Sequence, residues 1–107
     1  MNNSRIAILK QYVVEEPDEP FNLYALASEY LAEEPETALQ YLQELLFKHP
    51  RYLGTYYQIG KLYQSFDRTE EAKDAFHRGI SLALELRNAK ILQELRTALN
   101  EILDEEA

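Results

Sequence analysis

The side chains of this sequence that could take part in chemistry are closely spaced carboxylates and two histidines. Glu29 and Glu33 are four residues apart, as are Glu101 and Glu105, so each pair would share one face of a helix. Paired carboxylates can transfer protons or hold a cation, but on an acidic chain this spacing is more typical of a charged helix face. These pairs therefore predict no catalytic residue.

The histidines do not form a catalytic or metal-binding pattern. Neither His49 nor His77 has a second histidine three or four residues away, and His49 precedes Pro50 at an expected helix end, where histidine commonly caps carbonyl groups. The chain has no cysteine, which excludes disulfides and thiolate metal sites. No glycine-rich phosphate loop or activated serine is present. The sequence predicts neither an enzyme nor a bound cofactor or metal.

The composition is that of a globular protein, and the charge is acidic. Of 107 residues, 46% are hydrophobic and 28% are charged, which allows a modest core. The net charge of −8 argues against nucleic acid and anionic membranes, which a basic patch would attract. We expect a protein partner that is neutral or basic. Because no stretch resembles a signal peptide or a transmembrane helix, we also expect a cytoplasmic protein.

Prolines and capping residues divide the chain into six expected helices. Ser4 is the expected cap of the first helix, Thr69 or Asp67 of the fifth, and Asn88 of the sixth. One continuous helix from Glu70 to Glu105 is the alternative at the last boundary, but its length would be unusual for a small domain. The expected ranges are 4–14, 20–33, 35–48, 53–65, 70–86 and 88–105.

Two segments of the chain repeat the same pattern. Leu26-Ala27-x-x-Tyr30 recurs as Ile59-Gly60-x-x-Tyr63 at an offset of 33, and Ala38-x-x-x-Leu42 recurs as Ala72-x-x-x-Phe76 at an offset of 34. A period of this length indicates helical repeats that must stack on one another to bury their apolar faces.

These residues resemble the tetratricopeptide repeat signature, in which W-x2-L-G-x2-Y is followed by A-x3-F and a closing proline. Leu23 and Tyr56 stand at the tryptophan positions, Pro50 closes the first repeat, and Leu84 replaces the second proline. The resemblance covers residues 20–84 and implies an all-α fold of antiparallel helix pairs, stacked as a short right-handed solenoid. Within a single domain, 1–107, the expected parts are an N-terminal helix (4–16), two repeats (20–50 and 53–86) and a C-terminal capping helix (88–105).

The resemblance also implies a binding face. Proteins of this family bind an extended peptide or a helix in a concave face lined by the first helix of each repeat. Apolar and aromatic residues on such a face would form an exposed strip typical of interfaces, although Tyr24 and Tyr57 could instead pack against neighbouring helices. The groove residues implied here are Phe21, Tyr24, Ala25, Ser28, Leu31, Ala32, Tyr57, Gln58, Lys61, Gln64 and Ser65.

The sequence thus predicts a non-catalytic adaptor or scaffold that binds a peptide or helix of a partner protein. The alternative is an accessory subunit, or a homodimer whose main interface is the C-terminal helix. If the preceding helix covered only part of the apolar stripe on that helix, the rest would pair with a second copy. The stripe consists of Leu92, Leu95, Leu99, Ile102 and Leu103.

Overall fold

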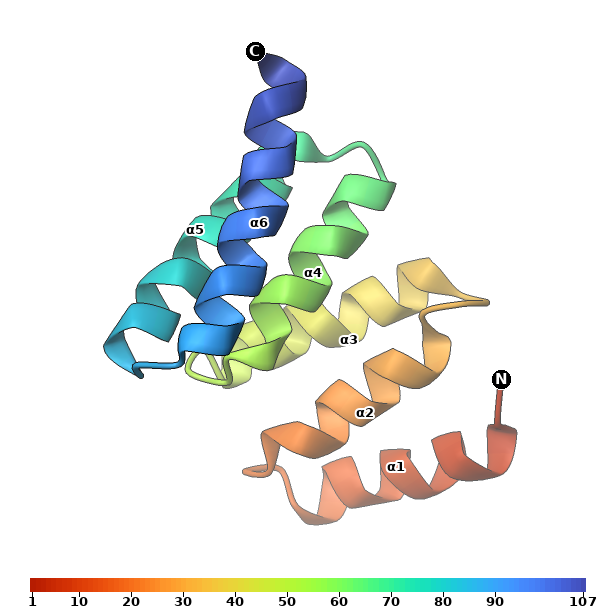
Figure 1. Cartoon of the computed structure of the whole chain (residues 1–107). Coiled ribbons are helices and arrows are strands. Elements are labelled where there is room, and N and C mark those ends of the chain that lie inside the picture. The colour runs from red at the N-terminus through yellow and green to blue at the C-terminus, as the bar shows by residue number, and fades with distance from the viewer. The chain divides into compact units, whose positions relative to one another are not determined.

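Six α-helices and no β-strand form the chain in the computed structural model, which describes residues 1–107 (Figure 1). This arrangement confirms the all-α expectation, and the expected boundary at Asn88 is correct, which excludes the single long helix. The helices are α1 (Asn3–Glu15), α2 (Pro20–Tyr30), α3 (Pro35–Lys48), α4 (Gly54–Ser65), α5 (Thr69–Glu85) and α6 (Ala89–Glu106).

The chain divides into two compact units, residues 1–55 and 56–107. In the first unit, α2 packs against both α1 and α3. The apolar residues of α2 recur every three or four positions, which places them on one face of the helix. That face is buried, together with the facing stripes of its two neighbours. The core residues are Ile6, Leu9, Leu23, Leu26, Ala27, Tyr30, Ala38, Leu39, Leu42 and Leu45.

In the second unit, α5 and α6 form an antiparallel pair, and small residues allow close approach between helices (Figure 1). A methyl group built on Gly60 of α4 would overlap the ring of Phe76 on α5. A methyl group on Gly79 would lie 2.6 Å from Cβ of Tyr56 and 3.0 Å from Leu95. Both glycines therefore stand where a larger residue has no room.

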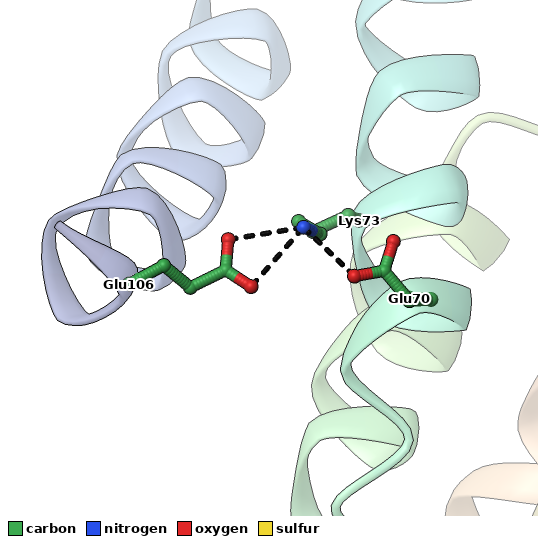
Figure 2. A network of polar contacts seen from close by, with 3 residues as sticks. All are labelled: Glu70, Lys73 and Glu106. Carbon is green, nitrogen blue, oxygen red and sulfur yellow. Dashed lines mark hydrogen bonds and ion pairs between the residues drawn. The ribbon is translucent and has the colours of Figure 1, made fainter.

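Lys73 links the two helices of this pair through its ammonium group. Its Nζ lies 3.0 and 3.1 Å from the two carboxylate oxygens of Glu106 and 3.0 Å from Glu70 (Figure 2). Hydrogen bonds to Glu106 and then to Glu70 raise the pKa of Lys73. The last turn of α6 is thereby held to the first turn of α5.

Three expected helix ends are corrected by the structure. Asn2, not Ser4, caps α1, because its side chain accepts a hydrogen bond from the backbone N–H of Arg5 at 3.0 Å. The N-cap position of α5 is Arg68, with no side-chain cap bond, so neither Asp67 nor Thr69 has that role. Asn88 does cap α6, accepting from Ile91 N–H at 3.0 Å.

The end of α2 is the third correction, because the helix stops at Tyr30 and not at Glu33. The residue before a proline is disfavoured in the helical conformation, so Glu34 cannot continue the helix into Pro35. The chain turns instead, with Glu34 N–H donating to the carbonyl of Tyr30 at 2.8 Å and Leu31 N–H to that of Ser28 at 3.4 Å.

Helices α4 and α5 end in the same way. Asp67 and Arg87 have φ angles of 58° and 57°, which is the left-handed conformation. After α5, Asn88 N–H donates to Ala83 at 3.0 Å and Arg87 N–H to Leu84 at 3.2 Å; after α4, Arg68 and Asp67 make the equivalent bonds. This pair of bonds defines a Schellman motif. Here the motif ends both helices although neither turn contains glycine or proline.

Candidate peptide-binding surface

Helix α2 presents a second face opposite its buried stripe. The α2 strip, as we name it, consists of Phe21, Tyr24 and Ser28 on this face and of Leu31, which directly follows the helix. Phe21 is 52% exposed, Ser28 is exposed, and Tyr24 and Leu31 are half-buried. Ala25, which was expected beside them, is buried, whereas Ala32 is exposed.

Tyr24 has a packing role as well as an exposed part. Its ring lies 5.6 Å from that of Tyr52, at a tilt of 54°. A methyl group on Gly54 would also come within 3.5 Å of the Tyr24 ring. Burial raises the pKa of Tyr52, with smaller effects of Tyr24 and Glu19 in the same direction. Phe21 is therefore the aromatic residue of the α2 strip whose side chain is most available to a partner.

Helix α4 carries the α4 strip, which consists of Tyr57, Gln58, Lys61, Gln64 and Ser65. Lys61 and Ser65 are exposed, and the other three residues are half-buried. The Tyr57 ring lies 6.4 Å from that of Phe76, so this tyrosine also packs on α5. The Ser65 hydroxyl donates to the carbonyl of Leu62 at 2.6 Å, and Gln64 Oε1 is buried without a hydrogen-bond partner. This strip is more polar than the α2 strip.

The glutamates and histidines that could take part in chemistry do not come together in one site. Glu29 pairs with Arg5, and because α2 ends at Tyr30, Glu33 no longer shares its helix face. Glu101 and Glu105 lie exposed on α6. His77 is exposed, and Nε2 of His49 lies 3.3 Å from the carbonyl oxygen of Pro17. No group of three or more potential ligands is placed to hold a metal ion.

The apolar stripe of α6 is divided between core and surface. Leu95, Leu99 and Ile102 are buried in the second unit, so they are not accessible to a second copy. Leu92 is half-buried and Leu103 is 43% exposed. Only these two of the five residues considered for self-association are accessible.

Sequence reasoning missed two exposed aromatic residues, Tyr12 on α1, which is 42% exposed, and Phe47 on α3. Phe47 on α3 is 85% exposed, although it follows Leu45 and Leu46 in what reads as an apolar helix end. Its position one residue beyond the buried stripe, next to the exposed Lys48, is the signal that could have identified it.

The fold defines an all-α helical-repeat protein with exposed apolar side chains on several of its helices. No helix combines the length and the apolar character required to cross a membrane. No protein-family model matches the chain, and no curated protein sequence matches it either.

Solved structures do match. The crystal structure of a tetratricopeptide repeat domain protein from Salinibacter ruber is 41% identical with a TM-score of 0.77, over 80% of this chain and 97% of that one. A solution structure of such a protein from the same organism is 42% identical with a TM-score of 0.76, over 81% and 89% of the two chains. A Bordetella parapertussis protein at 22% identity shares the fold, with a TM-score of 0.80 over 95% and 90%.

The chain belongs to the tetratricopeptide repeat family. The identity and coverage of the Salinibacter match confirm the resemblance of the repeat residues and the helical-repeat solenoid class. In general terms the chain is therefore a protein-interaction module, of a kind that is typically non-enzymatic.

Proposed function

We propose that the chain is an adaptor that binds a peptide or a helix of a partner protein, with the α2 strip as the contact surface of the first unit and the α4 strip as that of the second. The observation that carries this proposal is the 52% exposure of Phe21 on a helix whose opposite face is fully used in the core. An exposed phenylalanine beside half-buried Tyr24 and Leu31 offers apolar area to a partner. The α4 strip adds the exposed Lys61, and the Ser65 hydroxyl, which donates to Leu62, can still accept a hydrogen bond from a peptide.

The net charge sets the preferred partner. Residues 1–55 contain nine Asp or Glu and four Lys or Arg, a net charge of −5. An acidic surface favours encounter with neutral or basic segments and slows encounter with acidic ones. We therefore expect the segment bound at the α2 strip to be apolar and either neutral or basic.

The test replaces exposed residues and leaves the packed tyrosines intact. The double variant Phe21→Ser/Lys61→Ala should lose partner capture, because it removes the exposed apolar anchor and the exposed Lys61 side chain without adding a negative charge that would attract a basic partner. Phe47→Ser is the matched control, since it removes an even more exposed phenylalanine from α3. Captured proteins from the native host's lysate would be quantified by mass spectrometry.

The two variants give opposite outcomes under this proposal. Proteins retained by the wild type and by Phe47→Ser, but lost from the double variant, would support binding at the strips. Equal loss from both variants would indicate non-specific apolar contact. Capture that is unchanged in the double variant would contradict the assignment of the strips.

Self-association through α6 remains the second candidate. Leu103, 43% exposed, and half-buried Leu92 are the residues that favour it. Because the other three leucine or isoleucine residues are buried, the remaining apolar area is small for a stable dimer. Sedimentation velocity over a hundredfold concentration range would detect a dimer directly.

A further inference from the structure

The turn that joins α5 to α6 carries a hollow of about 300 Å³, which we call the turn pocket. Ligand pockets usually span roughly 300–1,000 Å³, so this one lies at the small end of that range and has room for one large side chain. The turn pocket lies in the second unit and shares no residue with either strip. It is lined by Ala83, Leu84, Arg87, Asn88, Ala89 and Leu92.

Apolar surface is concentrated at this turn. Leu84 is 52% exposed and Leu86 is 44% exposed, while Leu92 is half-buried. Leu84 and Leu92 come from different helices and line the same hollow. An apolar side chain entering between them would remove hydrophobic surface from water on both sides.

The one charged residue that lines the turn pocket is a cation, Arg87. Lys90 follows in the first turn of α6, and Glu85 and Glu94 lie on either side of these two cations in the sequence. Both cations are exposed. Neither takes part in an ion pair of the structure. A carboxylate that approaches these cations therefore displaces no existing partner.

The backbone fixes the turn before any ligand arrives. Arg87 holds a φ of 57°. Asn88 N–H bonds to Ala83, and the Asn88 side chain caps the N–H of Ile91 at 3.0 Å. A preformed turn loses little conformational freedom on binding, which lowers the cost of association.

We propose that the turn pocket binds a short acidic segment of a partner protein. One leucine- or phenylalanine-sized side chain enters between Leu84 and Leu92, and a neighbouring carboxylate pairs with Arg87 or Lys90. Arginine can bind a carboxylate through two parallel hydrogen bonds, which favours a peptide over an isolated apolar ligand. The charge preference is opposite to that expected for the α2 strip, so the two surfaces would contact different segments.

Fluorescence anisotropy with the full chain tests the proposal directly. The probe is a fluorescein-labelled peptide with the core Glu-Glu-Leu-Glu-Glu. Two control probes replace the leucine by serine or every glutamate by lysine. The acidic leucine probe should bind about fivefold or more tightly than either control, and rising salt should weaken it because exposed charges are screened.

Variants of Arg87 separate charge from folding. Arg87→Lys should weaken binding less than Arg87→Gly does, because lysine keeps the charge but cannot form two parallel hydrogen bonds, whereas Arg87→Gly should weaken binding about fivefold. Glycine favours the left-handed conformation, so loss of binding in Arg87→Gly cannot be ascribed to unfolding. Arg96→Gln, which removes another exposed cation of α6, is the matched control and should bind normally.

Amide chemical shifts locate the probe. Shifts confined to Leu84, Ala89 and Leu92 would support the turn pocket. Equal binding of the lysine probe, equal effects of Arg87→Gly and Arg96→Gln, shifts on the α2 or α4 strip, or no binding at millimolar probe would each overturn the proposal. A signal that appears only with a dimer in sedimentation would assign the pocket to a second copy and overturn it as well.

Discussion

The ring of Phe76 leaves no room for a side chain at Gly60. Phe76 is fully buried, so its ring has no free volume into which it could move. Gly54, by contrast, starts α4 in a place where a methyl group would meet its nearest neighbour at 3.4 Å, an ordinary contact distance. Glycine is therefore sterically required in the middle of α4, at Gly60, but not at the first residue of the helix, Gly54.

Gly60→Ala should lower the free energy of unfolding by about 2 kcal/mol, because overpacking a core exceeds the gain in helix propensity. Gly54→Ala should change it by less than about 0.5 kcal/mol. Denaturant titration followed by circular dichroism would measure both. Equal stability of the two variants would show that Gly60 is not at a close helix contact.

Arg68 and Glu71 form the best-defined exposed ion pair. Arg68 Nε and Nη2 donate to the two carboxylate oxygens of Glu71 at 2.7 and 2.6 Å, and its guanidinium lies 4.8 Å from the centre of the Tyr63 ring. The hydrogen bond from Arg68 lowers the pKa of Glu71 below its usual 4.5. A carboxyl group with a lowered folded-state pKa stabilises the fold above its unfolded pKa.

The Glu71 contribution should therefore be present at pH 7 and disappear as the pH falls from about 4.5 through the lowered pKa. The measurement is the difference in unfolding midpoint between the wild type and Glu71→Gln across that range. In an Arg68→Gln background the difference should vanish at every pH. A difference that stays constant down to acidic pH would show that the pair does not set it.

The ends of α4 and α5 show how an element can stop without a standard breaker. Neither turn contains glycine or proline, yet each places one residue in the left-handed conformation. That conformation costs an ordinary residue roughly 1–2 kcal/mol, and aspartate tolerates it better than arginine. The ends of α4 and α5 therefore depend on backbone hydrogen bonds whose stabilisation outweighs the strain of the left-handed residue.

Arg87→Gly should raise the free energy of unfolding by about 0.5–1 kcal/mol, since it relieves the strain at the end of α5. Ser81→Gly, an exposed position inside α5, should lower it by roughly 0.5 kcal/mol. Thermal melts of the two variants would give opposite signs. Destabilisation by both would mean that Arg87 makes a contact worth more than the strain it carries.

At the scale of the whole molecule, the burial of most of the α6 stripe limits the apolar area that self-association through α6 could use. Leu95 is fully buried in the second unit and lies against Gly79. The residues that bury Leu95 therefore belong to the same copy of the chain. An obligate dimer would instead need this stripe at its interface.

Leu95→Ala should lower the free energy of unfolding by about 2–5 kcal/mol, with a melting temperature that does not depend on protein concentration. Leu103→Ala, at an exposed position of the same helix, should cost less than about 1 kcal/mol. Melts at two concentrations a hundredfold apart would check both. A concentration-dependent wild-type melt that loses this dependence in Leu103→Ala would favour self-association.

The number, the type and most ends of the helices follow from the sequence, and so does the family. Apolar residues spaced three and four apart define a buried helix face, and prolines such as Pro17 and Pro35 end helices by local sterics. Ala27 and Ala38 recur as Gly60 and Ala72, and small residues at matching positions of two repeats predict that helices pack closely there. These features depend on residues near one another along the chain.

Only the tertiary structure decided which side chains a partner can reach. Tyr24 and Tyr57 lie off the buried stripes, yet rings from Tyr52 and Phe76 cover part of them. Leu95 is core, whereas Leu84, which stands in place of the second closing proline of the repeat signature, is exposed at the turn pocket. Exposure depends on what packs against a residue from distant positions in the chain, and helical periodicity does not encode those neighbours.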